Sequence, residues 1–144
     1  MPTFITLKKW FSYKIQAPAL RYLILIHCST GEVLWLSDAY PGATGEVTIF
    51  GDVAQYLMEE EKIFGYRIYS GNNLMNTRGM SNAERNIYDG VRALVERRIK
   101  SLRVFRIMKM EWRETCENTY QFHQDSVYVL AQLTNYYFKN RKDK

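Results

Sequence analysis

Basic side chains recur along the stretch Arg85–Lys109, where they could neutralise the phosphate groups of a nucleic acid. The eight Lys and Arg of this stretch are Arg85, Arg92, Arg97, Arg98, Lys100, Arg103, Arg106 and Lys109. On the helix that the stretch predicts, Arg92, Lys100 and Arg103 share a face with Asp89 and Glu96. The same face could equally be a solvent-exposed one on which Arg92, Glu96 and Lys100 form i,i+4 ion pairs. The residues alone leave both interpretations open.

The histidines and cysteines do not form a site pattern. His27 and His123 each stand alone and are typical of packed or surface residues rather than of ligands or bases. Cys28 and Cys116 have no CxxC partner and no His at metal-ligand spacing. Together with the absence of a signal-peptide pattern, this predicts free thiols in a reducing, intracellular compartment.

A long helix must position the basic residues, and the sequence predicts where it begins. Ser81 and Glu84 form the pattern of a capping box directly before an apolar repeat. The repeat has the 3.6-residue period of an amphipathic helix, and its members are Ile87, Val91, Leu94, Val95, Ile99 and Leu102. Arg98 falls within this apolar stripe, so it is expected to be buried and paired or to mark an interface.

Shorter elements precede the helix. Leu20–His27 (LRYLILIH) predicts a strand buried on both faces, and Val33–Ser37 predicts a second strand close enough to form a hairpin with it. Val53–Glu60 predicts a short helix, Phe64–Tyr69 a short strand, and the polar, Gly- and Asn-rich Ser70–Ser81 a loop.

The C-terminal part predicts further helix. Val104–Trp112 either continues the central helix or becomes a strand, Asn118–Phe138 predicts a final helix, and Lys139–Lys144 (KNRKDK) predicts a disordered tail. The order of elements predicts an α+β or α/β fold. A chain of 144 residues predicts one domain, spanning 1–144. Its longest apolar run, Tyr22–Ile26, is too short for a membrane span, and its net charge of +5 permits an anionic partner.

Five segments in the same order resemble the DDE superfamily of endonucleases, which includes the Harbinger-type transposases and the nucleases derived from them. Trp10–Ser37 looks like the start of the family's catalytic region, and Pro41–Phe50 (PGATGEVTIF) resembles its PGSxHDxTIF segment. Phe64–Tyr66 lies where the family has Asp-x-Gly-Tyr. Arg92–Arg103 (RALVERRIKSLR) resembles the helix that carries the last acidic residue, and Phe105–Arg113 (FRIMKMEWR) resembles the segment after it.

The resemblance implies an RNase H-like mixed sheet flanked by helices, and cleavage of DNA with a divalent metal, Mg²⁺ or Mn²⁺. In such chemistry carboxylates hold two metal ions that clamp the attacking and leaving oxygens. Glu46 stands where the family has the Asp of its His-Asp pair, and Glu96 stands where it has the helical Glu. Both are therefore candidate metal ligands and catalytic residues, with a surface acid as the alternative for each. Asp38 and Asp52 flank Glu46 and could replace a missing ligand.

The chain departs from the family at its acidic positions. Met1–Lys9 contains no acid where the resemblance implies the first Asp, so the first catalytic strand is expected to be absent. Ile63 replaces the Asp of Asp-x-Gly-Tyr, and Gly45 replaces the His before Glu46. The resemblance therefore implies a domain shortened at its N-terminus, with an incomplete acidic set and weak or no nuclease activity.

Three hypotheses follow. The first is a DDE-type endonuclease domain, nuclear in a eukaryote, that acts as a homo-oligomer or with a separate DNA-binding subunit. The second is a non-enzymatic module that binds DNA or a protein, with Arg92, Arg97, Lys100 and Arg103 contacting nucleic acid. The third is a non-functional fragment, with a sheet edge left unpaired by the missing strand.

Overall fold

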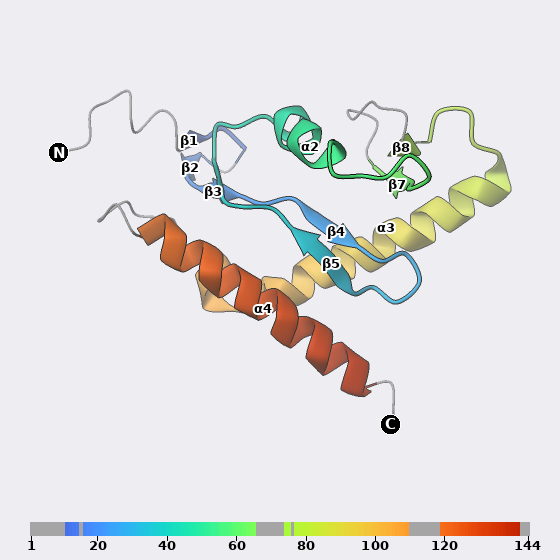
Figure 1. The fold of residues 1–144 in the computed structure, drawn as a ribbon. Helices are drawn as coiled ribbons and strands as arrows, with labels where there is room; N and C mark the ends of the chain where they lie inside the picture. Colours follow the sequence, from blue (N-terminus) through green and yellow to red (C-terminus); the bar gives the residue numbers. More distant parts are fainter. Residues whose placement is uncertain (1–10, 15, 66–73, 76, 110–118, 142–144) are drawn as a thin grey trace.

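The computed structural model describes residues 11–14, 16–65, 74–75, 77–109 and 119–141, in which short strands combine with longer helices (Figure 1). The strands are β1 (Phe11–Ser12), β2 (Ala17–Pro18), β3 (Leu20–Arg21), β4 (Ile24–Ile26), β5 (Val33–Leu36), β6 (Tyr40–Pro41), β7 (Ile63–Phe64) and β8 (Leu74–Met75). The helices are α2 (Glu46–Ala54), α3 (Asn82–Leu102), α4 (Thr119–Arg141) and the 3₁₀ turn η1 (Arg106–Met108). The predicted α+β class is confirmed. The described strands form pairs, and the RNase H-like arrangement stays a prediction.

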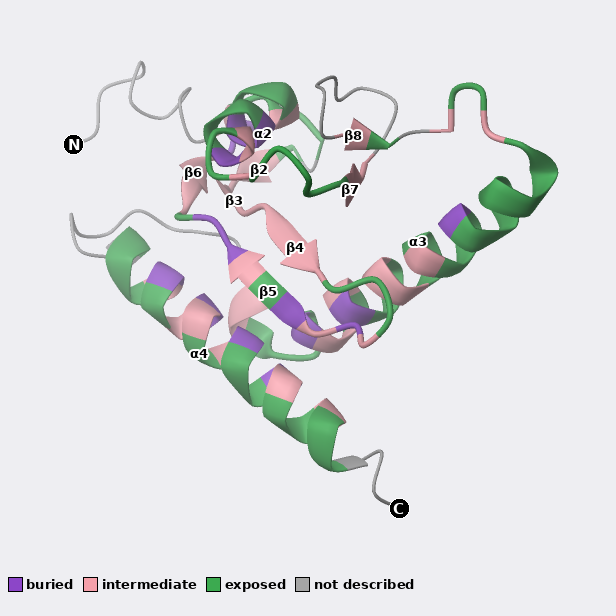
Figure 2. Cartoon of the chain, turned by 45° about the vertical axis from the view of Figure 1, so that its right-hand side comes forward, coloured by how far each residue is buried: buried purple, intermediate pink, exposed green. Residues whose placement is uncertain are grey.

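The core lies where the hairpin of β4 and β5 meets α4. Val33 and Leu36 of β5 form a buried cluster with Val127 and Ala131 of α4. Val127 and Ala131 are four residues apart, which puts them on one side of a helix. Val33 and Leu36 are three residues apart, which a regular strand would turn to opposite faces, but the register shift within the hairpin changes the alternation in β5. Figures 1 and 2 show α4 along one side of the hairpin and α2 on the other, with the buried surface turned inward. The hairpin is antiparallel, as the sequence predicts.

The predicted continuous strand Leu20–His27 is wrong, because the chain changes pairing partner at Leu23. β3 pairs with β6, whereas β4 pairs with β5. Between them the backbone N–H of Leu23 donates to Oγ of Ser37 at 2.9 Å, and the N–H of Ser37 donates to the carbonyl of Leu23 at 2.9 Å. A side chain thus replaces one ladder bond and ends the regular strand. Both pieces are half-buried rather than buried on both faces.

The first described helix begins earlier than predicted. α2 covers Glu46–Ala54 instead of Val53–Glu60, with Gly45 as its N-cap. Glu46 is an acid in the first turn, where it interacts favourably with the helix dipole. Ile49, Phe50 and Val53 form its buried face, and this short 3.6-period stripe is the signal that the sequence offered for the correct boundaries.

Helix α3 confirms the predicted start and corrects the predicted end. Both hydrogen bonds of the Ser81 capping box are present. The helix stops at Leu102, and the N–H groups of Val104 and Phe105 bond to carbonyls three residues back. The chain then forms the η1 turn, so Val104–Trp112 neither continues the helix nor forms a strand over its described residues, 104–109. Residues 110–112 lie outside the described part.

In the turn of α3 that contains Ile87, the buried side chain is not the one that the sequence predicts. Ile87, expected in the apolar stripe, is 62% exposed, and its neighbour Tyr88 is buried instead. The Tyr88 hydroxyl donates to the carbonyl of Gly65 at 3.1 Å, and its ring meets Phe64 edge to face at 6.0 Å. Tyr88 therefore packs the N-terminal half of α3 against β7.

The remaining predictions are met in part. Helix α4 extends to Arg141, so the predicted tail is helical up to that residue, and 142–144 lie outside the described residues. Phe122 of this helix is exposed. The predicted loop at 70–81 contains β8, which pairs in parallel with β7, and of the predicted strand Phe64–Tyr69 only the first two residues are described.

None of the described helices is long and apolar enough to cross a bilayer.

Candidate functional site

The outer side of α3 carries the predicted basic set. Arg85, Arg92, Arg97, Lys100 and Arg103 all lie on this helix or at its end, and all of them are exposed. Spacings of seven and eleven residues return a helix to within about 20° of one direction, so Arg85, Arg92 and Arg103 point the same way. Lys100 lies about 80° from Arg92, whereas Arg97 points about 140° from Arg92 and lies outside this group. We call Arg85, Arg92, Lys100 and Arg103 the basic face.

The basic face also contains two acids, Asp89 and Glu96, of which Glu96 forms an ion pair with one of the basic residues. Arg92 Nε bonds to Oε1 of Glu96 at 3.1 Å, which confirms one predicted i,i+4 pair. Within the described residues no carboxylate lies within ion-pair distance of Arg85, Lys100 or Arg103. At the N-terminal end, Arg85 lines a recess of about 430 Å³ together with Arg78 and Asp89.

Arg98 does not belong to the basic face, because it is buried as its position in the stripe predicts. It is 5% exposed, its Nη2 donates to the carbonyl of Thr30 at 3.2 Å, and its guanidinium lies 3.6 Å from the centre of the Phe138 ring. Nη1 has no hydrogen-bond partner among the described residues. Burial lowers the pKa of Arg98 from its ordinary value. The residue therefore joins α3, the β4–β5 turn and α4.

The two predicted metal ligands are each held by a different arginine. Glu46, at the start of α2, lies 3.8 Å from Nη1 of Arg21 on β3, and Glu96 pairs with Arg92 on α3. No three His, Cys, Asp or Glu side chains of the described residues are grouped as ligands for a metal ion. A two-metal site needs several carboxylates around one point, so these residues do not form a complete ligand set and we assign no metal-dependent step to them.

Comparison with known proteins adds no relative. No family model, no curated protein and no solved structure matches this chain. The resemblance to DDE endonucleases therefore stays a prediction that rests on the motifs themselves.

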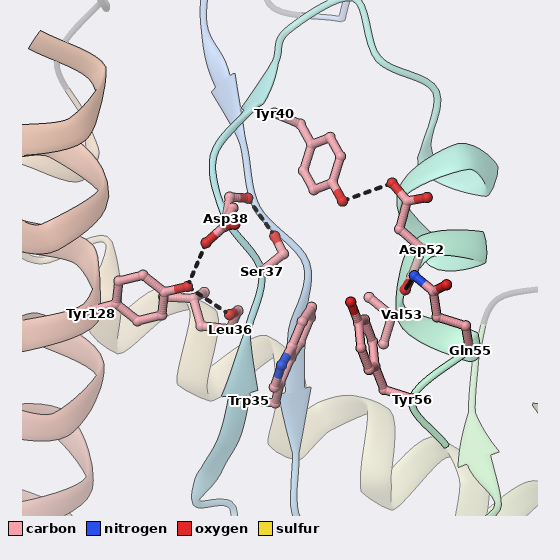
Figure 3. A pocket seen from close by; sticks show the side chains of 10 residues that line it. All are labelled: Trp35, Leu36, Ser37, Asp38, Tyr40, Asp52, Val53, Gln55, Tyr56 and Tyr128. Atoms are coloured by element: carbon pink, nitrogen blue, oxygen red, sulfur yellow. Dashed lines mark hydrogen bonds between the residues drawn. The ribbon is translucent and has the colours of Figure 1, made fainter. Parts of the chain in front are cut away.

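Asp38 and Asp52, expected only as substitute ligands, line one pocket of about 420 Å³ between β5, α2 and α4 (Figure 3). Tyr40 donates its hydroxyl to Oδ2 of Asp52 at 2.8 Å. Oδ1 of Asp38 accepts from the Tyr128 hydroxyl at 3.0 Å and from Nε2 of Gln124 at 3.1 Å. Each carboxylate is thus oriented by a tyrosine.

Both tyrosines stay neutral donors at physiological pH. Burial, followed by the hydrogen bond to Asp52 and the charges of Asp52 and Asp38, raises the pKa of Tyr40 to about 12. Burial and then the hydrogen bond to Asp38 raise the pKa of Tyr128. Since the charges of both aspartates act on Tyr40, the pocket has a negative potential at the point between them.

His123 is a packed residue rather than a free base. Its Nδ1 lies 2.7 Å from the Tyr22 hydroxyl and its Nε2 lies 3.2 Å from the carbonyl of Ile107. These partners fit a neutral ring that carries its proton on Nε2 and accepts at Nδ1. Burial lowers the pKa of His123, partly offset by the bond to Ile107. The other histidine, His27, is exposed at the β4–β5 turn, with Thr30 and Ser29 as partners.

The His123 pKa predicts how stability depends on pH. An unfolded histidine binds its proton near pH 6.5, whereas the folded one binds it only at lower pH, so acidification favours the unfolded chain. We expect the free energy of unfolding to fall from pH 7.5 to pH 5, and to fall less in His123→Gln, which keeps both polar atoms but does not titrate. Urea unfolding at several pH values measures this, and parallel pH curves for the two proteins would contradict it.

No pattern in the sequence indicates that Trp35, Tyr40 and Tyr56 line the same pocket as the two aspartates. The available signal was general: aromatic residues make up 15% of the chain, and several stand beside the acidic residues. The spacing of Trp35, Asp52 and Tyr128 in the sequence does not indicate that they lie close together. Tertiary packing brings them into one pocket.

Proposed function

We propose that this chain is a DNA-binding module that holds the phosphate backbone of duplex DNA with the basic face of α3. The observation that carries the proposal is the alignment of Arg85, Arg92 and Arg103 on the outer side of the helix, with Lys100 beside them. Cations on a rigid helix can follow phosphates without ordering a loop, and their charge gives salt-dependent binding without sequence preference.

Further features support this proposal. The net charge of +5 favours association with a polyanion, and Arg78 with Arg85 in the recess beside α3 extends the basic surface. Arg97, which points about 140° from Arg92, would reach a phosphate only on a bent or wrapped duplex. DNA as the partner would place the protein in the nucleus of a eukaryotic cell. A homo-oligomer or a separate DNA-binding subunit would add the sequence specificity that phosphate contacts lack.

The salt dependence of binding tests the role of the basic face. Each phosphate contact that a substitution removes makes the slope of log K against log salt concentration shallower by about 0.9 on duplex DNA. We expect Lys100→Gln combined with Arg103→Gln to reduce the slope by about 2, measured by fluorescence anisotropy with a labelled duplex.

The matched control is Lys14→Gln combined with Lys139→Gln, which removes the same charge from exposed positions that are not part of α3. The control should keep the wild-type slope. Equal slopes for all three proteins, or no binding by the folded wild type, would refute the basic face as the DNA contact.

The second candidate function is a metal-dependent DNA endonuclease of the DDE type, which the ordered motif resemblance favours. Glu46 and Glu96 would be its acidic residues and Mg²⁺ or Mn²⁺ its cofactor. Nicking of supercoiled plasmid in Mn²⁺ that disappears in Glu96→Gln, but not in the surface control Glu59→Gln, would establish it. Plasmid binding with no nicking by the folded chain would leave the binding module as the function.

A further inference from the structure

The pocket between β5, α2 and α4 combines aromatic rings with negative charge. Its volume of about 420 Å³ is that of a small-molecule site. Figure 3 shows Trp35 of β5 and Tyr56, which follows α2, beside each other, with Tyr40 near Asp52 and Tyr128 of α4 on the other side of the β5 ribbon. Trp35 and Tyr40 are half-buried, and Tyr56 is 75% exposed. The ring faces can therefore be approached from solvent.

The charge of the pocket opposes that of the chain. Its lining contains two carboxylates, Asp38 and Asp52, and no Lys or Arg among the described residues, although the chain as a whole has a net charge of +5. Anionic DNA is therefore disfavoured here, and a cation is attracted. The inference below is independent of the DNA-binding proposal, because none of the pocket's residues belongs to the basic face.

Each carboxylate also retains an oxygen that can receive a ligand. Tyr40 bonds to Oδ2 of Asp52, and within the described residues no hydrogen bond reaches Oδ1. Tyr128 and Gln124 both bond to Oδ1 of Asp38, and within the same residues none reaches Oδ2. The tyrosine bonds fix the two carboxylates without occupying their second oxygens.

We propose that this pocket binds an alkylated ammonium cation, with Trp35, Tyr40 and Tyr56 around its methyl groups and Asp38 and Asp52 balancing its charge. Ring faces are electron-rich and attract a cation within about 6 Å, most strongly one that is weakly hydrated. A divalent metal would instead need more oxygen ligands than these two carboxylates supply. The ammonium group could belong to a free small cation such as choline or to a methylated lysine side chain.

Titration of the full chain with choline chloride, followed by ligand-observed NMR, tests the proposal against NaCl of equal concentration. We expect saturable binding of choline and none of 3,3-dimethyl-1-butanol, which has the same shape without the charge. Asp52→Asn and Tyr56→Leu should each weaken binding by about fivefold to tenfold, which corresponds to about 1 kcal/mol for the charge or the ring that each variant removes.

Two matched variants serve as controls. Asp89→Asn makes the same charge change on α3, and Tyr136→Leu removes a ring that is 70% exposed on α4 and outside the pocket lining. Both should bind choline like the wild type. A trimethyllysine peptide that binds more tightly than choline would identify a protein side chain as the source of the cation, and weaker binding would identify a free small cation. Equal binding of the neutral alcohol, unchanged binding by Asp52→Asn and Tyr56→Leu, or no saturation would overturn the proposal.

Discussion

Gly31→Val should destabilise the protein by about 3 kcal/mol, because a valine side chain has no space at this position and the backbone conformation there is unfavourable for any residue with a Cβ. Gly31 has a φ of +72°, where a residue with a Cβ is strained. A Cβ there would lie 2.9 Å from Nε of Arg98 and 3.0 Å from Cδ1 of Leu94. Arg98 has little freedom to yield, since the Thr30 carbonyl and the Phe138 ring hold its guanidinium.

Chemical unfolding followed by far-UV circular dichroism measures this effect. The control is Gly90→Ala, in the interior of α3, where a Cβ meets nothing within 4 Å. This control should stabilise the protein by about 0.5–1 kcal/mol, since alanine has the higher helix propensity. A Gly31→Val variant within about 1 kcal/mol of the wild type would show that the turn at Gly31 is not packed against Arg98.

The parts of the fold that depend on neighbours in the sequence were predictable. The capping box of Ser81 and Glu84 is local chemistry, and it placed the start of α3 correctly. Arg98 lies in the apolar stripe, which predicts either a buried and paired residue or an interface, and the structure shows it buried with a hydrogen bond to the Thr30 carbonyl. The hairpin followed from two apolar runs separated by a turn.

Errors arose where a contact between distant residues decides the structure. The hydroxyl of Ser37, 14 positions away in the sequence, accepts a hydrogen bond from the N–H of Leu23, and this contact separates β3 from β4. Burial of Tyr88 instead of Ile87 depends on Phe64 and on the carbonyl of Gly65, which only the tertiary fold brings near. In both cases the local apolar pattern indicated a strand or a buried helix position, and contacts with residues distant in the sequence changed the outcome.

The candidate sites divide in the same way. The basic face lies on one helix, so its geometry could be derived from spacing alone. The aromatic and acidic pocket takes residues from β5, α2 and α4, and Asp38 and Asp52 could be named beforehand only as acids near Glu46. Neither the spacing nor the composition of the sequence predicts which aromatic side chains line the pocket with Asp38 and Asp52.

Leu102→Ala should cost about 3 kcal/mol of unfolding free energy, within the range of buried Leu→Ala substitutions. Leu102 ends α3 and is 1% exposed, so its truncation leaves a cavity that the neighbours fill only partly. Leu133→Ala on α4 makes the same chemical change at a side chain that is 52% exposed, and should change stability by less than about 1 kcal/mol. Since helix propensity changes equally in both variants, the difference between them isolates burial. Equal costs in urea unfolding would mean that the end of α3 is not docked in solution, and the basic face would then lack the rigid support on which its phosphate contacts depend.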